Sequence, residues 1–153
     1  MHTSSMKLMT EFRDKYLAGM TGCTILDVGA LQLPKHDSYR SLFGNYRYTG
    51  MDIVPGRNVD IVGYEGLVRG YDVVISGQVM EHVARPWEWL ATLARRYNSY
   101  ICIIAPNTFK EHRYPLDCYR FWPDGMRALF EYAGIVPLEI RRDGIDTIGI
   151  GGR

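Results

Sequence analysis

Short, continuous apolar runs that alternate with stretches of helical periodicity constrain this chain more than any other feature of its sequence. Such runs, bounded by turn residues, are typical of strands buried on both faces of a parallel sheet. Strands are predicted over residues 24–30, 46–53, 58–62, 71–76 and 100–105. Helices are predicted over residues 5–17, 86–96 and 123–133. The alternation predicts an α/β fold with a doubly wound, mostly parallel sheet and right-handed crossovers.

The C-terminal segment departs from that alternation. Residues 136–142 and 146–150 flank an Asp143-Gly144 turn, which predicts an antiparallel hairpin. With this hairpin the expected sheet has seven strands. The 153 residues show no repeat, linker or low-complexity segment, and a chain of this length buries enough surface for one core. We therefore expect a single domain over residues 1–153.

The charge and the cysteine content exclude several classes of protein. A formal net charge of +1 offers no basic stripe to DNA or RNA, so no nucleic-acid partner is expected. Cys23, Cys102 and Cys118 form no CxxC pair, which favours free thiols in a reducing compartment. The N-terminus lacks the apolar core of a signal peptide, and no apolar run is long enough to cross a membrane. We expect a cytoplasmic protein with no membrane partner.

Two carboxylates and a glycine lie where the first two strands are predicted to end. Asp27 and Gly29 close the first strand, and Asp52 closes the second. In an open parallel sheet ligands bind beyond the carboxyl ends of the strands, where a glycine allows close approach of the backbone. A carboxylate after the second strand can accept hydrogen bonds from both hydroxyls of a ribose. Asp27 as a turn residue and Asp52 as a strand-end cap are the structural alternatives.

A phosphate-binding loop is missing from the sequence. No GxGxxG follows the first predicted strand, and GxxxxGK(S/T) does not occur. A pyrophosphate therefore lacks its usual cradle of backbone amides. The pattern favours a cofactor that has a ribose and no phosphate.

Three segments together resemble the ordered motifs of class I S-adenosylmethionine-dependent methyltransferases. They are residues 26–30 (LDVGA), residues 48–52 (YTGMD) and residues 71–83 (YDVVISGQVMEHV), and residues 146–150 resemble the last strand of that family. The resemblance implies a Rossmann-like fold, methyl transfer, and S-adenosylmethionine as the cofactor.

The resemblance also implies which residues contact the cofactor. Asp27, Gly29 and Ala30 would contact its methionine part. Asp52 would bind the ribose, Ile53 would pack on the adenine, and Tyr64 would flank the adenine edge. Gly77, Gln78 and Val79 would line the cofactor after the fourth strand. The sequence departs from the family at residues 31–34, LQLP in place of further glycines, and the helix after the first strand is expected to be short or absent.

His82 follows the fourth strand, where a general base for the acceptor would lie. Its alternative role is a hydrogen-bonded side chain that fixes the loop, and Glu81 is either a loop carboxylate or part of the site wall. No metal is expected, because Glu81 and the histidines 36, 82 and 112 show no ligand spacing such as HxxxH.

Residues 106–122 form an unusually long, polar and aromatic connection for a sheet. Within it, EHRYP (residues 111–115) and DCYRFWPDGM (residues 117–126) resemble small methyltransferases of surface-polysaccharide and other glycan pathways. The resemblance implies a substrate lid. Its candidate catalytic residues are His112 and Asp117, and its candidate acceptor-binding residues are Tyr114, Tyr119 and Arg120. Phe121 and Trp122 are expected to anchor the loop on the core.

The sequence therefore predicts a methyltransferase that acts on an oxygen or nitrogen atom of a small polar acceptor, with a sugar or glycan intermediate as one candidate. A non-catalytic module with a degenerate methyltransferase fold and a nucleotide-dependent oxidoreductase are the alternatives. A homodimer that completes the site is a further hypothesis.

Overall fold

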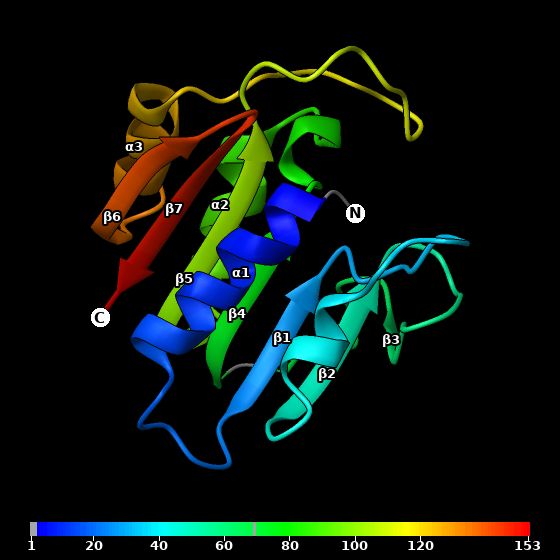
Figure 1. Ribbon diagram of the computed structural model, residues 1–153, viewed down its shortest axis with the longest axis vertical. Coiled ribbons are helices and arrows are strands. Elements are labelled where there is room, and N and C mark those ends of the chain that lie inside the picture. Colours follow the sequence, from blue (N-terminus) through cyan, green and yellow to red (C-terminus); the bar gives the residue numbers. More distant parts are fainter. Residues whose placement is uncertain (1–2, 69) are drawn as a thin grey trace.

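A seven-stranded sheet in the order β3-β2-β1-β4-β5-β7-β6 runs through the computed structural model, which describes residues 3–68 and 70–153 (Figure 1). The strands are β1 (Thr24–Val28), β2 (Arg47–Asp52), β3 (Ile61–Val62), β4 (Tyr71–Gly77), β5 (Tyr97–Pro106), β6 (Val136–Asp143) and β7 (Asp146–Gly152). The helices are α1 (Thr3–Tyr16), α2 (Pro86–Ala94) and α3 (Pro123–Tyr132), with 3₁₀ turns η1 (Tyr39–Leu42) and η2 (Met80–His82).

The sheet is mostly parallel and ends in an antiparallel hairpin, as the sequence predicted. Strands β1 to β5 pair in parallel, whereas β7 lies antiparallel between β5 and β6. Gly144 turns the hairpin with a positive φ of 56°. The third strand is shorter than predicted, with two residues, and β5 begins at Tyr97 rather than at residue 100.

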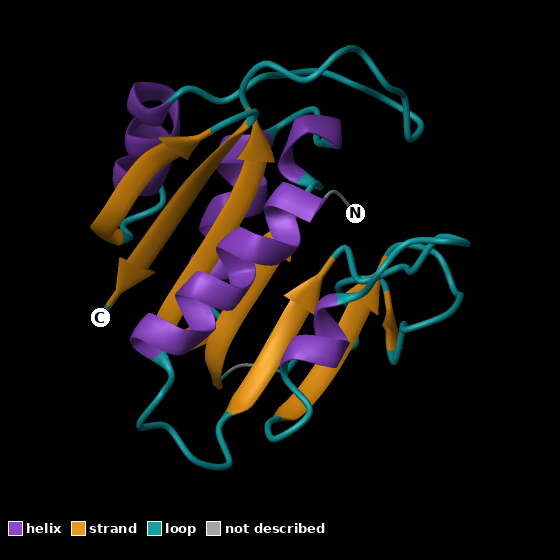
Figure 2. Ribbon diagram, in the orientation of Figure 1, coloured by secondary structure: helices purple, strands orange, loops and turns teal. Residues whose placement is uncertain are grey.

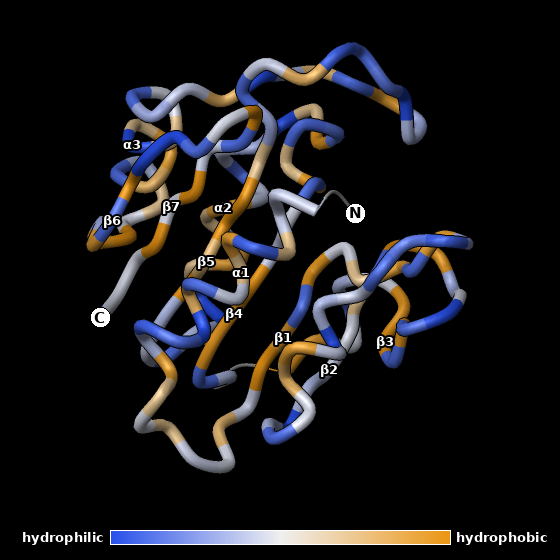
Figure 3. The backbone as a smooth tube through the Cα atoms, in the orientation of Figure 1, coloured by the Kyte–Doolittle hydropathy of each residue, from blue (hydrophilic) through white to orange (hydrophobic). Residues whose placement is uncertain are grey.

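Helices cover both faces of the sheet, so the domain has two cores (Figure 2). Successive strand residues point to opposite faces, so Ile25 and Leu26 belong to different cores. The core under α1 includes Leu8, Met9 and Phe12, and the other core lies under α2 and α3. Apolar residues concentrate in the central strands β4 and β5 (Figure 3). Within the described chain, no helix is long and apolar enough to cross a membrane.

The connection from β1 to β2 contains a 3₁₀ turn instead of a full helix. Ser38 caps η1 by accepting a hydrogen bond from the Arg40 backbone N–H at 3.1 Å, and Tyr39 and Phe43 are buried against the sheet. This confirms the expectation of a short or absent helix at this point. The irregular segment 31–38 is consequently free to line the edge of the sheet above β1.

Candidate functional site

A cavity of about 640 Å³ opens at the carboxyl ends of β1, β2 and β4. The chain leaves β1 towards β2 on one side and reaches β4 on the other, so the cavity lies at the topological switch point of the sheet, where open α/β sheets bind ligands. Its wall includes many of the residues selected from the sequence: Gly29, Ala30, Asp52, Ile53, Tyr64, Gly77, Gln78, Val79, His82, His112 and Tyr114. The segments that follow strands β1 to β5 thus meet in one concave site.

At Gly29 and Gly77 the backbone passes so close to neighbouring side chains that a Cβ would not fit. Gly29 has a φ of +85°, and a Cβ there would lie 2.1 Å from Cγ2 of Val79. A Cβ on Gly77 would lie 1.9 Å from the hydroxyl of Tyr39. Any larger residue would push neighbouring side chains, so these positions require glycine, and the backbone itself forms the cavity wall.

Asp52 presents a carboxylate in the wall at the end of β2. Its Oδ2 accepts from the Leu31 backbone N–H at 3.1 Å, and its Oδ1 accepts from the Val54 N–H at 3.4 Å. These two bonds fix the carboxylate, which keeps lone pairs for a ligand diol. The neighbouring Ile53 side chain is 65% exposed, which leaves an apolar surface at the cavity rim.

Asp27 does not line the cavity, although Gly29 and Ala30 of the same predicted set do, and its contact with the cofactor stays a prediction. Its side chain is buried and forms no part of the cavity wall. The hydroxyl of Tyr48 donates a short hydrogen bond to it. Burial raises the pKa of Asp27 to about 7 despite this bond. Asp27 therefore supports the structure from behind the site.

Two further wall residues are held by side-chain hydrogen bonds. The Trp89 indole donates to the Tyr64 hydroxyl at 2.7 Å, which fixes Tyr64 from α2. Gln78 has a φ of +62°, and its amide nitrogen donates to Asp146 at 2.9 Å. Its Oε1 is buried and has no hydrogen-bond partner among the described residues. An unpartnered acceptor at this position suits a ligand that carries a donor.

The long loop between β5 and α3 arches over the carboxyl edge of the sheet (Figure 1). Arg120 holds it together. The guanidinium donates to both carboxylate oxygens of Asp117, at 2.5 and 2.8 Å, and to the backbone carbonyls of Phe109 and Lys110. Asp117 also accepts from the His112 N–H at 2.6 Å. The bond from Arg120 holds the pKa of Asp117 far below its ordinary value.

Three residues that the sequence assigned to chemistry or acceptor binding lie outside the cavity wall, and their roles stay predictions. Asp117, Tyr119 and Arg120 do not line the cavity. Asp117 and Arg120 instead form hydrogen bonds with each other and with the loop backbone. The Tyr119 hydroxyl instead donates to the Ala84 carbonyl at 3.1 Å. His112 and Tyr114 are the lid residues from the sequence-based set that reach the wall.

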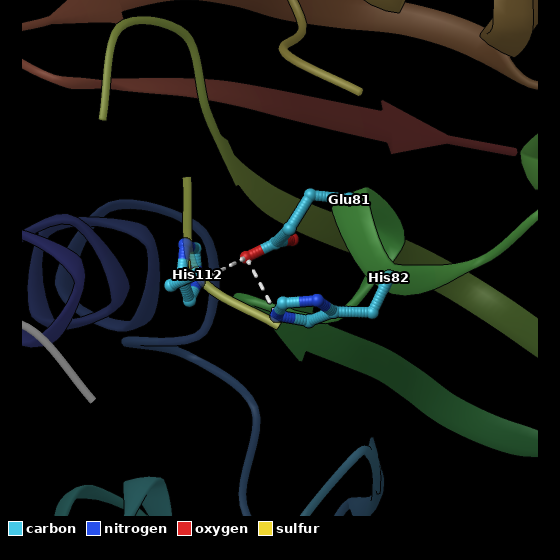
Figure 4. A group of neighbouring side chains, drawn as sticks. All are labelled: Glu81, His82 and His112. Atoms are coloured by element: carbon cyan, nitrogen blue, oxygen red, sulfur yellow. Dashed lines mark ion pairs between the residues drawn. The ribbon is translucent and has the colours of Figure 1, made fainter. Parts of the chain in front are cut away.

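His82, His112 and Glu81 meet beneath the lid (Figure 4). The Nε2 atoms of His82 and His112 lie 3.5 and 3.8 Å from the same Glu81 carboxylate oxygen. Glu81 is fully buried, and neither of its carboxylate oxygens has a hydrogen-bond partner in the described chain. Burial raises the pKa of Glu81 to about 8 and lowers that of His82. Sequence spacing missed this cluster, because His112 reaches it from a distant loop.

The segment after β1 also contributes more than the sequence suggested. Six of its residues line the cavity: Leu31, Gln32, Leu33, His36, Asp37 and Ser38. The departure from the family pattern at residues 31–34 therefore builds wall rather than removing it. In the sequence, the sole sign that residues 31–38 line the cavity was LQLP at residues 31–34 in place of further glycines.

Comparison with known proteins shows the fold. No protein-family model matches the sequence, and no curated protein matches it. Solved structures do match. The 1,6-didemethyltoxoflavin-N1-methyltransferase of Burkholderia thailandensis, crystallised with S-adenosylhomocysteine, has a TM-score of 0.75 at 14% identity, over 98% of this chain and 78% of that one. This is a methyltransferase-like fold.

Two further structures agree with that assignment. The magnesium protoporphyrin IX methyltransferase of Synechocystis, with bound S-adenosylhomocysteine, has a TM-score of 0.69 at 15% identity, over 98% of this chain and 82% of that one. The N-terminal domain of EvdMO1, in the presence of S-adenosylhomocysteine and D-fucose, has a TM-score of 0.62 at 19% identity, over 99% of this chain and 83% of that one. At these identities the likeness establishes the fold alone.

Proposed function

We propose that this protein binds S-adenosylmethionine and transfers its methyl group to an oxygen or nitrogen atom of a small polar acceptor. The observation that carries the proposal is the cavity at the switch point, which brings together Gly29 after β1, Asp52 after β2 and residues 77–79 after β4. Structures of the same fold that were crystallised with the cofactor or its demethylated product support it.

The wall suits the parts of this cofactor. Asp52 offers carboxylate oxygens to the ribose hydroxyls, and Ile53 and Tyr64 offer apolar surface to the adenine. Gly29 and the unpartnered Oε1 of Gln78 lie where the methionine part would extend, and that oxygen can accept from its ammonium. The bound cofactor supplies a methyl group already activated on a sulfonium, so the protein mainly has to align the acceptor.

A dinucleotide fits this wall less well. In the described chain, the stretch between β1 and β2 offers only the four-residue η1 and an irregular segment. No helix of useful length presents its N-terminal amides to a pyrophosphate there. We therefore favour methyl transfer over the oxidoreductase alternative.

The acceptor would lie between His82, His112 and Tyr114 at the lid side of the cavity. The Nδ1 atom of His82 lies 2.6 Å from the Leu116 carbonyl oxygen, so this nitrogen carries the proton and Nε2 carries a lone pair. That lone pair can accept a hydrogen bond from an acceptor hydroxyl or amine. One protein of the same fold was crystallised in the presence of D-fucose, so a sugar is the acceptor class to test first.

Product analysis by mass spectrometry tests the proposal. Incubation of the protein with S-adenosylmethionine and a panel of sugars, nucleotide sugars and small amines should yield one methylated product. His112→Ala should slow its formation at least tenfold while S-adenosylhomocysteine affinity stays within threefold, because His112 lies on the acceptor side. Cofactor binding with no product from any acceptor would favour the non-catalytic module.

A further inference from the structure

Three side chains beneath the lid, those of Glu81, His82 and His112, turn oxygen and nitrogen atoms that can bind a metal towards one another. One ligand atom from each of Glu81, His82 and His112 lies within 4.8 Å of the others. The two Nε2 atoms lie 3.5 and 3.8 Å from one carboxylate oxygen, which is longer than a hydrogen bond. The three side chains are in contact, with the two imidazole rings edge to face and their centroids 4.9 Å apart, but no hydrogen bond joins either ring to Glu81.

The other nitrogen of each imidazole is already used. His82 Nδ1 lies 2.6 Å from the Leu116 carbonyl, and His112 Nδ1 lies 3.2 Å from the Lys110 carbonyl and 3.6 Å from Asp117. A carbonyl can only accept, so each Nδ1 donates and each Nε2 lone pair faces Glu81. Histidines that bind metals are oriented in this way, by a backbone carbonyl or a carboxylate behind the ring.

Within the described chain, the Glu81 carboxylate also lacks hydrogen-bond partners of its own. It is completely buried, and neither oxygen has a hydrogen-bond partner among the described residues. Burying a carboxylate without partners is costly, and native structures seldom leave such a group unsatisfied. A cation between the carboxylate and the two imidazoles would satisfy all three groups at once.

We propose that Glu81, His82 and His112 form a binding site for a divalent transition-metal ion at the lid end of the cavity. Two ligands at about 2.1 Å from an ion in a tetrahedral arrangement are roughly 3.4 Å apart, close to the distances to Glu81. Two imidazoles and one carboxylate suit Zn²⁺, Fe²⁺, Co²⁺ or Ni²⁺ better than Ca²⁺ or Mg²⁺. The ligands come from η2 and from the lid, so an ion would also fasten the lid to the sheet edge.

The open coordination positions of this ion would face the cavity, because His82 and His112 line it while Glu81 lies behind them. An acceptor oxygen entering the cavity can take one of these positions. This part of the inference rests on the proposed function, and it narrows the acceptor to molecules that present a hydroxyl or carboxylate oxygen. With an ion bound, both Nε2 lone pairs would hold the ion instead of accepting from the acceptor. The ion would lower the pKa of a bound acceptor hydroxyl, whose proton would pass to solvent in the cavity.

Direct metal binding tests the site without any acceptor. Protein prepared without a polyhistidine tag and stripped with a chelator is titrated with Zn²⁺ and with Co²⁺, by calorimetry and by the visible absorption of Co²⁺. We expect one ion per chain with a dissociation constant in the low micromolar range or below. Glu81→Gln and His112→Gln should each weaken binding at least tenfold. Glu111→Gln, an exposed lid carboxylate outside the cavity wall, is the matched control and should bind as the wild type does, and Cys118→Ser excludes the exposed thiol as a ligand.

Each outcome of that titration is decisive. Failure of the wild type to bind either ion below 100 µM would overturn the site, as would wild-type metal affinity in both Glu81→Gln and His112→Gln. If Glu81→Gln does not fold, as judged by circular dichroism, His112→Gln decides alone, because its side chain is partly exposed. S-adenosylhomocysteine affinity is measured on the same samples. In the wild type, absence of metal binding with normal S-adenosylhomocysteine binding would refute this site only, and metal binding without S-adenosylhomocysteine binding would refute the proposed function only.

Discussion

Asp27 is a buried acidic residue whose hydrogen-bond partner, Tyr48, lies in the neighbouring strand β2. It lies one residue before the end of β1 and forms no part of the cavity wall, and its carboxyl accepts a hydrogen bond from the Tyr48 hydroxyl. Burial raises its pKa to about 7, compared with about 3.9 for an unfolded aspartate. A group whose pKa is raised in the folded state stabilises the fold at low pH and loses that contribution as the pH rises.

Asp27→Asn tests this assignment. The stability of the wild type relative to the variant should fall by roughly 4 kcal/mol between about pH 4 and pH 7, because the folded state holds a proton that the unfolded state releases. Urea unfolding at several pH values measures the difference. The exposed Asp124→Asn provides the control and should show no such trend. A difference between Asp27→Asn and wild type that is independent of pH would contradict a buried, protonated Asp27.

Gly29 allows a second test at the residue scale. Gly29→Ala should destabilise the protein by about 3 kcal/mol, from the positive φ and from the contact with Val79. In the Val79→Ala background the steric part should disappear and about 1 kcal/mol should remain. Chemical denaturation of the four proteins in this cycle measures the coupling. Additive effects of the two substitutions would show that the contact does not exist.

At the scale of elements, the loop between β5 and α3 is positioned by its own side chains. The Asp117–Arg120 pair and the two carbonyls that Arg120 binds replace the hydrogen bonds that a strand or helix would provide. His112 and Tyr114 can reach the cavity because this brace holds the rest of the loop. Asp117 and Arg120 are therefore positioning residues.

Arg120→Lys should loosen the lid without unfolding the sheet. Lysine keeps the charge and loses the planar fork, so several hydrogen bonds to the loop backbone disappear. Backbone amides of residues 109–120 should exchange with solvent at least tenfold faster, which corresponds to a loss of about 1.4 kcal/mol or more in the free energy of local opening. Amides of β5 should stay protected. Hydrogen exchange with mass spectrometry gives both readings. Arg113→Lys, at a residue of the same loop that is 74% exposed, should change neither. Unchanged exchange in Arg120→Lys would show that the brace is dispensable.

At the scale of the whole molecule, the sequence predicted the fold better than the site. The seven strands and three helices follow from hydrophobic periodicity, and the hairpin follows from the Asp143-Gly144 turn. Wall residues such as Gly29 and Asp52 were found because they directly follow strands, and strand ends meet at one edge of a parallel sheet.

The lid side of the site was less predictable for a physical reason. The path of the loop depends on which polar side chains pair with one another, and the pairing of Asp117 with Arg120 removes both from the cavity. The meeting of Glu81 with His112 is a tertiary contact between η2 and the loop, so no spacing rule along the chain could show it.

The central claim is that the cavity at the switch point binds S-adenosylmethionine through Asp52. Calorimetric titration with S-adenosylhomocysteine tests it most directly, using the wild type, Asp52→Asn and the exposed control Asp124→Asn. We predict micromolar binding at one site per chain in the wild type and the control. Loss of a charged acceptor for the ribose should weaken Asp52→Asn by about 10- to 100-fold. No binding to the folded wild type, or wild-type affinity in Asp52→Asn, would contradict the account.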